Sequence, residues 1–224
     1  MKKLEIDIVS DVVCPWCALG YAHLEQALDA LEQDEIQADI HWRAFELNPH
    51  MGADGQEINE HLMEKYGSTA EQLSENKQRL VDLGKAAAVD FNFDERSRIY
   101  NTFDCHKLLH WAADLQHEAG EEQGLQTSLK QALFSAYFKD GRDISDRNIL
   151  LNVVENLGLD VEQAKVVLES EEMKAAVRQE QKQFQSMGIS AVPAFIINKQ
   201  YLISGGQPVD VFKQALTEIL GKSE

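Results

Sequence analysis

The sequence contains few cysteines, few basic residues and no long apolar run. Only 3 of its 224 residues are cysteine, which excludes a zinc site made of four thiolates. Its 38 acidic residues outnumber 21 lysines and arginines, and the net charge of −17 argues against nucleic acid or an anionic membrane as a partner. Because no apolar run is long enough to cross a bilayer, we expect no membrane span.

The N-terminus lacks the apolar segment of a secretory signal. Lys2 and Lys3 supply the positive charge with which such a signal begins, but Glu5 and Asp7 then interrupt the apolar residues. We therefore expect a cytoplasmic protein. Thiols stay reduced in that compartment, so a closely spaced cysteine pair there is more often catalytic than structural.

The most informative stretch is Cys14-Pro15-Trp16-Cys17. It follows residues 4–8, where apolar and acidic side chains alternate as in a strand, and it runs into a helical pattern. Pro15 suits the first position of a helix, which places Cys14 at the helix N-terminus. The free N–H groups and the dipole there predict a lowered Cys14 pKa, and Cys17 lies one turn further on, within reach of a disulfide.

A strand that ends in C-x-x-C before a helix is typical of a redox site. We expect Cys14 to be the attacking thiolate and Cys17 the resolving thiol, with Pro15 and Trp16 between them setting the reduction potential. Trp16 is also expected to contact substrate. The alternatives are half of a mixed cysteine and histidine zinc site, and two buried cysteines without chemistry.

The remaining pattern predicts an α/β fold with a large all-helical insertion. A helix over 15–32 and a strand over 37–47 complete a β-α-β unit, and strands at 194–197 and 201–204 form a hairpin before a closing helix at 209–220. Between them, helices are expected over 69–86, 101–117, 122–138, 146–157, from 160, and over 171–187. We therefore predict a discontinuous thioredoxin-like domain, 1–56 and 170–224, and an insertion domain, 57–169.

A second motif, Val192-Pro193, precedes the hairpin. Thioredoxin-like proteins place a cis-proline opposite the active cysteines at this point of the chain, and we expect the Val192–Pro193 bond to be cis. Such a bond would turn the backbone N–H and C=O of Val192 outward, where they bind an extended substrate. The alternative is an ordinary trans proline at the start of a strand.

Three segments together resemble the DsbA-like family, specifically its FrnE-like branch of cytoplasmic dithiol–disulfide oxidoreductases. They are 11–17, 101–106, and Val192-Pro193 with 204–207. The resemblance covers nearly the whole chain. It implies a protein disulfide oxidoreductase or isomerase that acts on thiol- or disulfide-containing proteins or small molecules. It also implies no resident cofactor or metal, glutathione as an alternative redox partner, and a homodimer.

Two positions depart from the pattern of that family. Thioredoxin-like proteins often carry a buried acid six residues before the first cysteine, to assist the second, but this chain has Ile8 there. Asp7 should point to the opposite face of the strand, whereas Asp11 lies in the connecting turn, so the acid that assists Cys17 is left open. Cys105 stands where a small residue is expected; it is either a buried small hydrophobe or a third thiol that traps mixed disulfides.

Several other residues have competing interpretations. His106, His110 and Asp114 recur at a spacing that metal ligands use, although a solvated face or a face packed on the insertion is the simpler explanation. Trp42 and Trp111 are expected in the core. Two rival functions also remain: a glutathione-dependent isomerase or transferase, since 2-hydroxychromene-2-carboxylate isomerases and kappa-class transferases resemble this branch, and a holdase-like chaperone.

Overall fold

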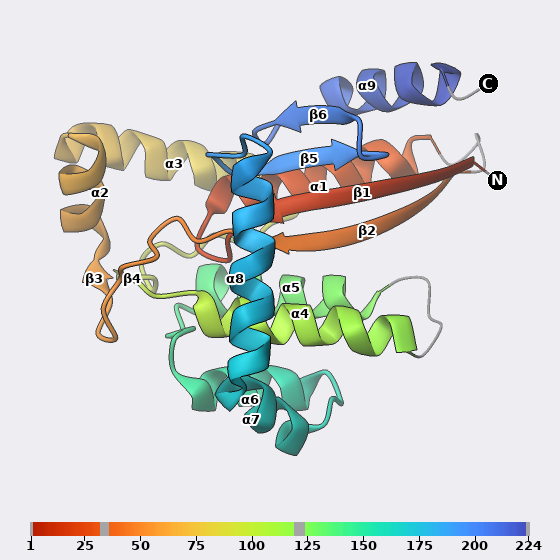
Figure 1. Cartoon of the computed structure of the whole chain (residues 1–224). Helices are drawn as coiled ribbons and strands as arrows, with labels where there is room; N and C mark the ends of the chain where they lie inside the picture. Colours follow the sequence, from red (N-terminus) through yellow and green to blue (C-terminus); the bar gives the residue numbers. More distant parts are fainter. Residues whose placement is uncertain (1, 32–35, 119–123, 223–224) are drawn as a thin grey trace.

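The computed structural model describes residues 2–31, 36–118 and 124–222, and a four-stranded mixed sheet lies at its centre (Figure 1). The strands lie in the order β2-β1-β5-β6 and span Lys2–Ser10 (β1), Ile36–Ala44 (β2), Ala194–Ile197 (β5) and Tyr201–Ser204 (β6). β1 and β2 are parallel, whereas β5 runs antiparallel to both β1 and β6. The predicted hairpin is confirmed at its predicted residues.

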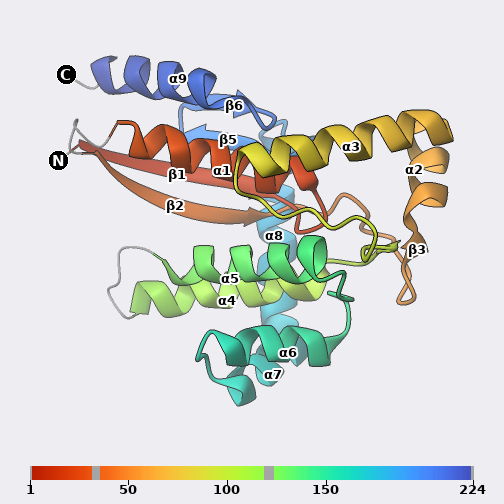
Figure 2. The same cartoon turned by 180° about the vertical axis from the view of Figure 1, so that it is seen from behind.

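Helices cover both faces of this sheet. α1 (Pro15–Asp29) and α9 (Val209–Lys222) pack on one face, and α8 (Glu171–Ser186) crosses the other (Figures 1 and 2). The alternation along β1 explains this division, because Ile6 and Ile8 join the core under α1 while Val9 packs with Phe184 of α8.

The segment between β2 and α8 is the predicted helical insertion. Its helices are α2 (Ile58–Tyr66), α3 (Ala70–Ala86), α4 (Phe103–Glu118), α5 (Leu125–Phe134), the π-helical turn η2 (Ser135–Lys139), α6 (Arg147–Asn156) and α7 (Val161–Glu169). The two-residue strands β3 (Gln56–Glu57) and β4 (Arg98–Ile99) pair at its base, and the sequence pattern did not indicate them. The structure therefore confirms a thioredoxin-like sheet with a helical insertion.

Local chemistry sets the boundaries of these elements. α3 begins with a capping box, in which the Thr69 hydroxyl and the Gln72 side chain each bind the other's backbone N–H. The strand predicted to reach residue 47 ends at Ala44, because the N–H of Ala44 binds Glu180 and that of Leu47 binds Asp11. α1 ends at Asp29. Residues 32 and 122, predicted as the end of one helix and the start of another, lie outside the described residues.

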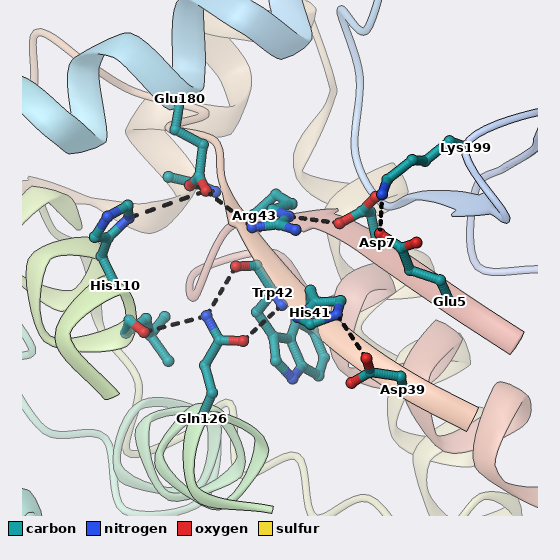
Figure 3. Close-up of polar contacts among 12 residues, drawn as sticks. Glu5, Asp7, Asp39, His41, Trp42, Arg43, His110, Gln126, Glu180 and Lys199 are labelled. Carbon is teal, nitrogen blue, oxygen red and sulfur yellow. Dashed lines mark hydrogen bonds and ion pairs between the residues drawn. The ribbon is translucent and has the colours of Figure 1, made fainter. Parts of the chain in front are cut away.

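The insertion attaches to the sheet along the edge strand β2. Gln126 of α5 accepts a hydrogen bond from the backbone N–H of Trp42 at 2.9 Å and donates one to its carbonyl at 3.0 Å (Figure 3). The Trp42 ring packs against Tyr21 of α1 and Phe134 of α5, at centroid distances of 5.0 and 6.0 Å. One hydrophobic core therefore runs from the sheet into the insertion, and Trp42 and Trp111 are buried as predicted. The domain boundaries at 56 and 170 stay a prediction.

No helix in the described part of the chain is long and apolar enough to cross a membrane.

Candidate active site

Cys14 and Cys17 lie at the N-terminus of α1, as the sequence predicts. Cys14 is the N-cap residue in an extended conformation, Pro15 occupies the first turn, and the Cys14 carbonyl accepts the backbone N–H of Cys17 at 3.0 Å. Both thiols are free. Cys14 is 3% exposed and Cys17 is fully buried, so Cys14 is the cysteine that a substrate reaches first.

Val192 and Pro193 lie against Cys14. The Val192–Pro193 bond is cis, which confirms the prediction. The Cys14 thiol donates to the Val192 carbonyl at an Sγ–O distance of 3.8 Å, so this carbonyl points at Cys14 in the reduced protein and not outward. The Val192 N–H has no hydrogen-bond partner among the described residues. Of the two Val192 backbone groups predicted to bind an extended substrate, only the N–H is therefore free.

Two glycines fix the distance between α1 and the loop after β6. A Cβ atom on Gly206 would lie 2.7 Å from the Trp16 carbonyl oxygen, and one on Gly20 would lie 3.0 Å from the Cα of Gly206. Real Cβ atoms essentially never approach a backbone atom as closely as 2.7 Å, so this contact requires glycine at 206, and a side chain at 20 would push the two segments apart by a few tenths of an ångström. The Gly205 N–H also binds the Pro193 carbonyl at 2.8 Å, which ties the loop to the cis-proline.

The electrostatics of Cys14 differ from the sequence prediction. The side-chain hydrogen bond with Cys17, then burial and the charge of Cys17, raise the pKa of the Cys14 thiol well above its ordinary value. The prediction of a lowered Cys14 pKa is therefore wrong for the reduced pair. The physical reason is proximity in the interior, because the neighbouring Cys17 and burial both disfavour the charged form of Cys14.

Asp11 is a buried acid beneath the cysteines. Its Oδ2 accepts the backbone N–H of Leu47 at 2.6 Å, and its Oδ1 lies 3.6 Å from Nε2 of His106, which α4 supplies from the insertion. Burial raises the pKa of Asp11, but the neighbouring His106, the hydrogen bond from the Leu47 N–H and the nearby Thr102 together lower it by more, so the net direction is down. Asp11 is therefore a carboxylate held in the interior next to the thiols.

Asp7 lies on the other face of the sheet, as predicted. Its Oδ1 accepts a hydrogen bond from Nε of Arg43 at 2.5 Å, and Arg43 reaches Glu180 of α8 at 3.5 Å (Figure 3). These side chains line a cavity of about 500 Å³ between α8 and the sheet. Ile8, at the usual position of the assisting acid, is fully buried in the core. Of Asp7 and Asp11, only Asp11 therefore faces the cysteines.

A family model described as the DSBA-like thioredoxin domain matches residues 5–217, nearly the whole chain and the entire site. The chain belongs to the DSBA-like thioredoxin domain family. Placement in its FrnE-like branch stays a prediction.

Known relatives of this DSBA-like chain cover its full length. A probable DsbA oxidoreductase from Streptomyces coelicolor is 32% identical, with a TM-score of 0.84 over 97% of this chain and 90% of that one. The Bacillus subtilis "Uncharacterized protein YwbO" is 27% identical over 216 residues, 96% of each chain. The cytosolic disulfide reductase DsbM from Pseudomonas aeruginosa, solved with GSH, has a TM-score of 0.61 at 18% identity, over 96% of this chain and 98% of that one, which shows the fold alone.

The rim of the DSBA-like site carries exposed side chains that the sequence analysis missed, apart from Trp16. Trp16 is 37% exposed, and the Arg79 guanidinium lies over its ring at 5.7 Å. Tyr66 of α2 is also exposed, and burial followed by the charge of Cys14 raises the pKa of Tyr66, which places Tyr66 within electrostatic reach of Cys14. The only sequence signal for Tyr66 was its place just before Gly67, the helix C-cap.

Cys105 lies deep in the insertion of this DSBA-like domain. It is fully buried, and its thiol donates to the Ile144 carbonyl at 3.3 Å. Burial, followed by the charge of Asp11, raises the pKa of the Cys105 thiol. These contacts favour the interpretation of Cys105 as a small buried hydrophobe over a trapping thiol.

The predicted group of His106, His110 and Asp114 does not converge on one site. His106 is buried against Asp11, His110 lies 4.0 Å from Glu180, and Asp114 is exposed. Among residues 2–31, 36–118 and 124–222, no three metal-binding side chains come together.

Lys130 is a buried lysine of the insertion that the sequence analysis missed. It is 1% exposed and lies on the apolar side of α5, between the buried Leu129 and Leu133. The signal was present: Gln126, Lys130 and Leu133 recur at the spacing of a core-facing helix side, so a lysine there is a buried cation.

Proposed function

We propose that this protein is a cytoplasmic thiol–disulfide oxidoreductase in which Cys14 exchanges with the substrate and Cys17 resolves the product. The observation that carries the proposal is the arrangement of two reduced thiols at the N-terminus of α1, with the Sγ of Cys14 beside the Val192 carbonyl. A thiol in this position meets an extended substrate held by the free N–H of Val192.

The exchange proceeds in two displacements. The Cys14 thiolate attacks one sulfur of a substrate disulfide; a Cys14–substrate bond forms, the substrate S–S bond breaks, and the leaving sulfur departs with its electron pair and takes up a proton. Cys17 then loses its proton and attacks the Cys14 sulfur, which closes the Cys14–Cys17 disulfide and releases the second substrate thiol. The substrate gains two electrons and two protons; the reverse sequence oxidises it.

The substrate is a thiol- or disulfide-containing protein or small molecule, with no resident cofactor in either step. Arg79 at the rim and the structural likeness to a cytosolic disulfide reductase solved with GSH support glutathione as the redox partner. The likeness also supports a cytoplasmic location. A homodimer stays a prediction from the family resemblance.

The test is insulin disulfide reduction by dithiothreitol with wild type, Cys14→Ser and Cys17→Ser. We expect wild type to accelerate the reaction, Cys14→Ser to abolish the acceleration, and Cys17→Ser to accumulate a mixed disulfide at Cys14, identified by mass spectrometry. Full activity in Cys14→Ser would refute the assigned roles.

The same variants separate the two rival functions. A glutathione-dependent isomerase or transferase retains activity without Cys17. A holdase suppresses aggregation even in the Cys14→Ser, Cys17→Ser double variant. Either result, together with absent disulfide exchange in wild type, would replace the proposal.

A further inference from the structure

Arg79 of α3 carries a positive charge at the rim of the active site. Its guanidinium lies over the ring of Trp16, 5.7 Å from the ring centroid, and Trp16 stands between the two cysteines in the sequence. Two Cα–Cα steps of about 3.8 Å each hold the Trp16 Cα within about 7.6 Å of the Cys14 Cα. A substrate group that is a few bonds away from the sulfur that meets Cys14 therefore comes close to Arg79.

Apolar packing of α3 on α1 fixes this place. Leu80, which follows Arg79 directly, packs against the cluster of buried side chains to which Leu19 and Ala22 of α1 belong. Figures 1 and 2 show α3 running up to α1. The hydrophobic core thus holds the part of α3 that carries Arg79 alongside the helix that begins at the cysteines.

The protein does not neutralise the positive charge of Arg79. The side chain is exposed, and no hydrogen bond or ion pair joins its guanidinium to another residue in the part of the chain that the structure describes. Lys77, two residues earlier on α3, is by contrast paired with Asp94 at 2.6 Å. Contact with a ring leaves the N–H groups of a guanidinium available, and their planar fork matches the two oxygens of a carboxylate.

The surroundings of Arg79 otherwise disfavour an anionic substrate. The chain has a net charge of −17. The buried Asp11 lies in the turn before the cysteines, where its backbone carbonyl accepts the N–H of Cys14 at 3.2 Å. Because like charges repel an approaching anion, an unpaired arginine at the rim gives a carboxylate a local attraction that the rest of the protein does not supply.

We propose that Arg79 is a specificity-determining residue that binds a carboxylate beside the substrate disulfide while Cys14 attacks the sulfur. The proposal rests on the proposed function and names its preferred substrates: disulfides with a negative charge close to the S–S bond. Arg79 takes no part in the bond changes, because arginine keeps its proton at neutral pH, and electrons and protons move only as in the two displacements of the exchange. It raises the rate by holding the anionic substrate near Cys14.

The test compares two chromogenic disulfides. One is 5,5′-dithiobis(2-nitrobenzoic acid), which has a carboxylate on each half, and the other is 4,4′-dithiodipyridine, which is neutral at pH 7. With either reagent, attack by Cys14 releases one chromophore in a second-order step, and attack of Cys17 on the mixed disulfide releases another in a first-order step.

In Arg79→Gln we expect the second-order rate with the anionic reagent to fall about fivefold, while the rate with the neutral reagent stays near that of wild type. The intrinsic reactivity of each reagent cancels when the variant is compared with wild type. An equal change with both reagents, or no change with either, would overturn the proposal.

Arg142→Gln is the matched control. Arg142 is also an exposed arginine of the insertion with no ion pair among the described residues, but it lies in the loop after η2. We expect this variant to react with both reagents at the wild-type rates. If it loses as much rate with the anionic reagent as Arg79→Gln does, net charge and not Arg79 sets the preference, and the proposal is overturned. Circular dichroism checks that each variant is folded.

Salt separates the charge of Arg79 from its packing on Trp16. In 1 M salt, which screens charges beyond about 3 Å, the effect of Arg79→Gln on the anionic reagent should shrink below about twofold. An undiminished effect would mean that lost contact with the Trp16 ring slows the reaction, and would overturn the role of the charge.

Peptide disulfides identify the source of the carboxylate. We expect a capped peptide disulfide with Glu beside each cysteine to react faster than its Gln counterpart, and Arg79→Gln to remove the difference. Such a result assigns the carboxylate to protein side chains. Equal rates in wild type, with the anionic reagent still dependent on Arg79, assign it to small-molecule disulfides and keep the proposal. An inactive insulin assay in wild type would refute the proposed function and is distinct from every outcome with Arg79→Gln.

Discussion

Asp7 and Asp11 are two buried acids four residues apart, and they take part in different sets of side-chain interactions. They are 5% and 0% exposed, respectively. Asp7 points toward α8 and binds Arg43, a permanent cation, in a network that continues to Glu180 (Figure 3). Asp11 points toward the insertion, where it meets His106 and shares the interior with the thiols and Lys130.

The comparison teaches that burial alone does not make an acid part of a redox site. Residue 7 lies within β1, where alternation sends its side chain to the face opposite Ile6 and Ile8. Asp7 there binds Arg43, which also reaches Glu180 of α8. Residue 11 lies after the strand, where alternation no longer applies, and its carboxylate turns under α1. The face, and the partners found there, decide the role of each acid.

The largest effect that we expect from this pair is that of Asp11→Ala. The variant leaves the Leu47 N–H and the buried His106 without their partner, and we expect it to lower the free energy of unfolding by about 3 kcal/mol at pH 7. Urea denaturation at fixed ionic strength measures this loss.

The pH dependence of that loss follows from the lowered pKa of Asp11. A group whose pKa is lower in the folded state contributes stability above its unfolded value, about 3.9 for Asp, and loses it as the pH falls through the folded value. The difference between wild type and Asp11→Ala should therefore be largest at neutral pH and shrink below about pH 4. A constant difference from pH 7 to pH 3 would contradict the assigned pairing.

Much of this fold could be predicted because local signals and tertiary structure agree. The strand–C-x-x-C–helix order, the capping box at Thr69 and the hairpin before α9 each follow from nearest neighbours along the chain. Val192-Pro193 was found by its place between a helix and a hairpin. These features depend on backbone conformations that a few adjacent residues dictate.

The unpredicted part of the site depends on contacts between distant segments. Lys130 lies buried against the Trp42 ring because Gln126, one turn before it, binds the edge of β2, 84 residues earlier in the chain. The raised pKa of Cys14 likewise follows from packing the two thiols together in the interior, which the pattern C-x-x-C does not reveal. Tyr66 comes within electrostatic reach of Cys14 through the placement of α2, which no local signal specified.

Asp7→Ala should have a smaller effect than Asp11→Ala, and only on stability. Arg43 keeps Glu180 as a partner and is 28% exposed, so water compensates part of the lost ion pair. We expect a loss of about 1–2 kcal/mol in the free energy of unfolding. The rates of both exchange steps with 5,5′-dithiobis(2-nitrobenzoic acid) should equal those of wild type. A slower attack of Cys17 on the mixed disulfide at Cys14 would show that the two faces of β1 are coupled.

Glu180→Gln should have the smallest effect on the free energy of unfolding. It tests the α8 end of the Asp7–Arg43–Glu180 network. The glutamine oxygen still accepts the Ala44 N–H, a 2.8 Å hydrogen bond in wild type, while the charge facing Arg43 at 3.5 Å is lost. Arg43 retains Asp7, so we expect a loss of at most about 1 kcal/mol, and less at high salt. Denaturation at low and high salt measures it. A loss as large as that of Asp11→Ala would mean that Glu180, and not Asp7, is the acid that fixes Arg43, and would make α8 rather than β1 the element that organises this face.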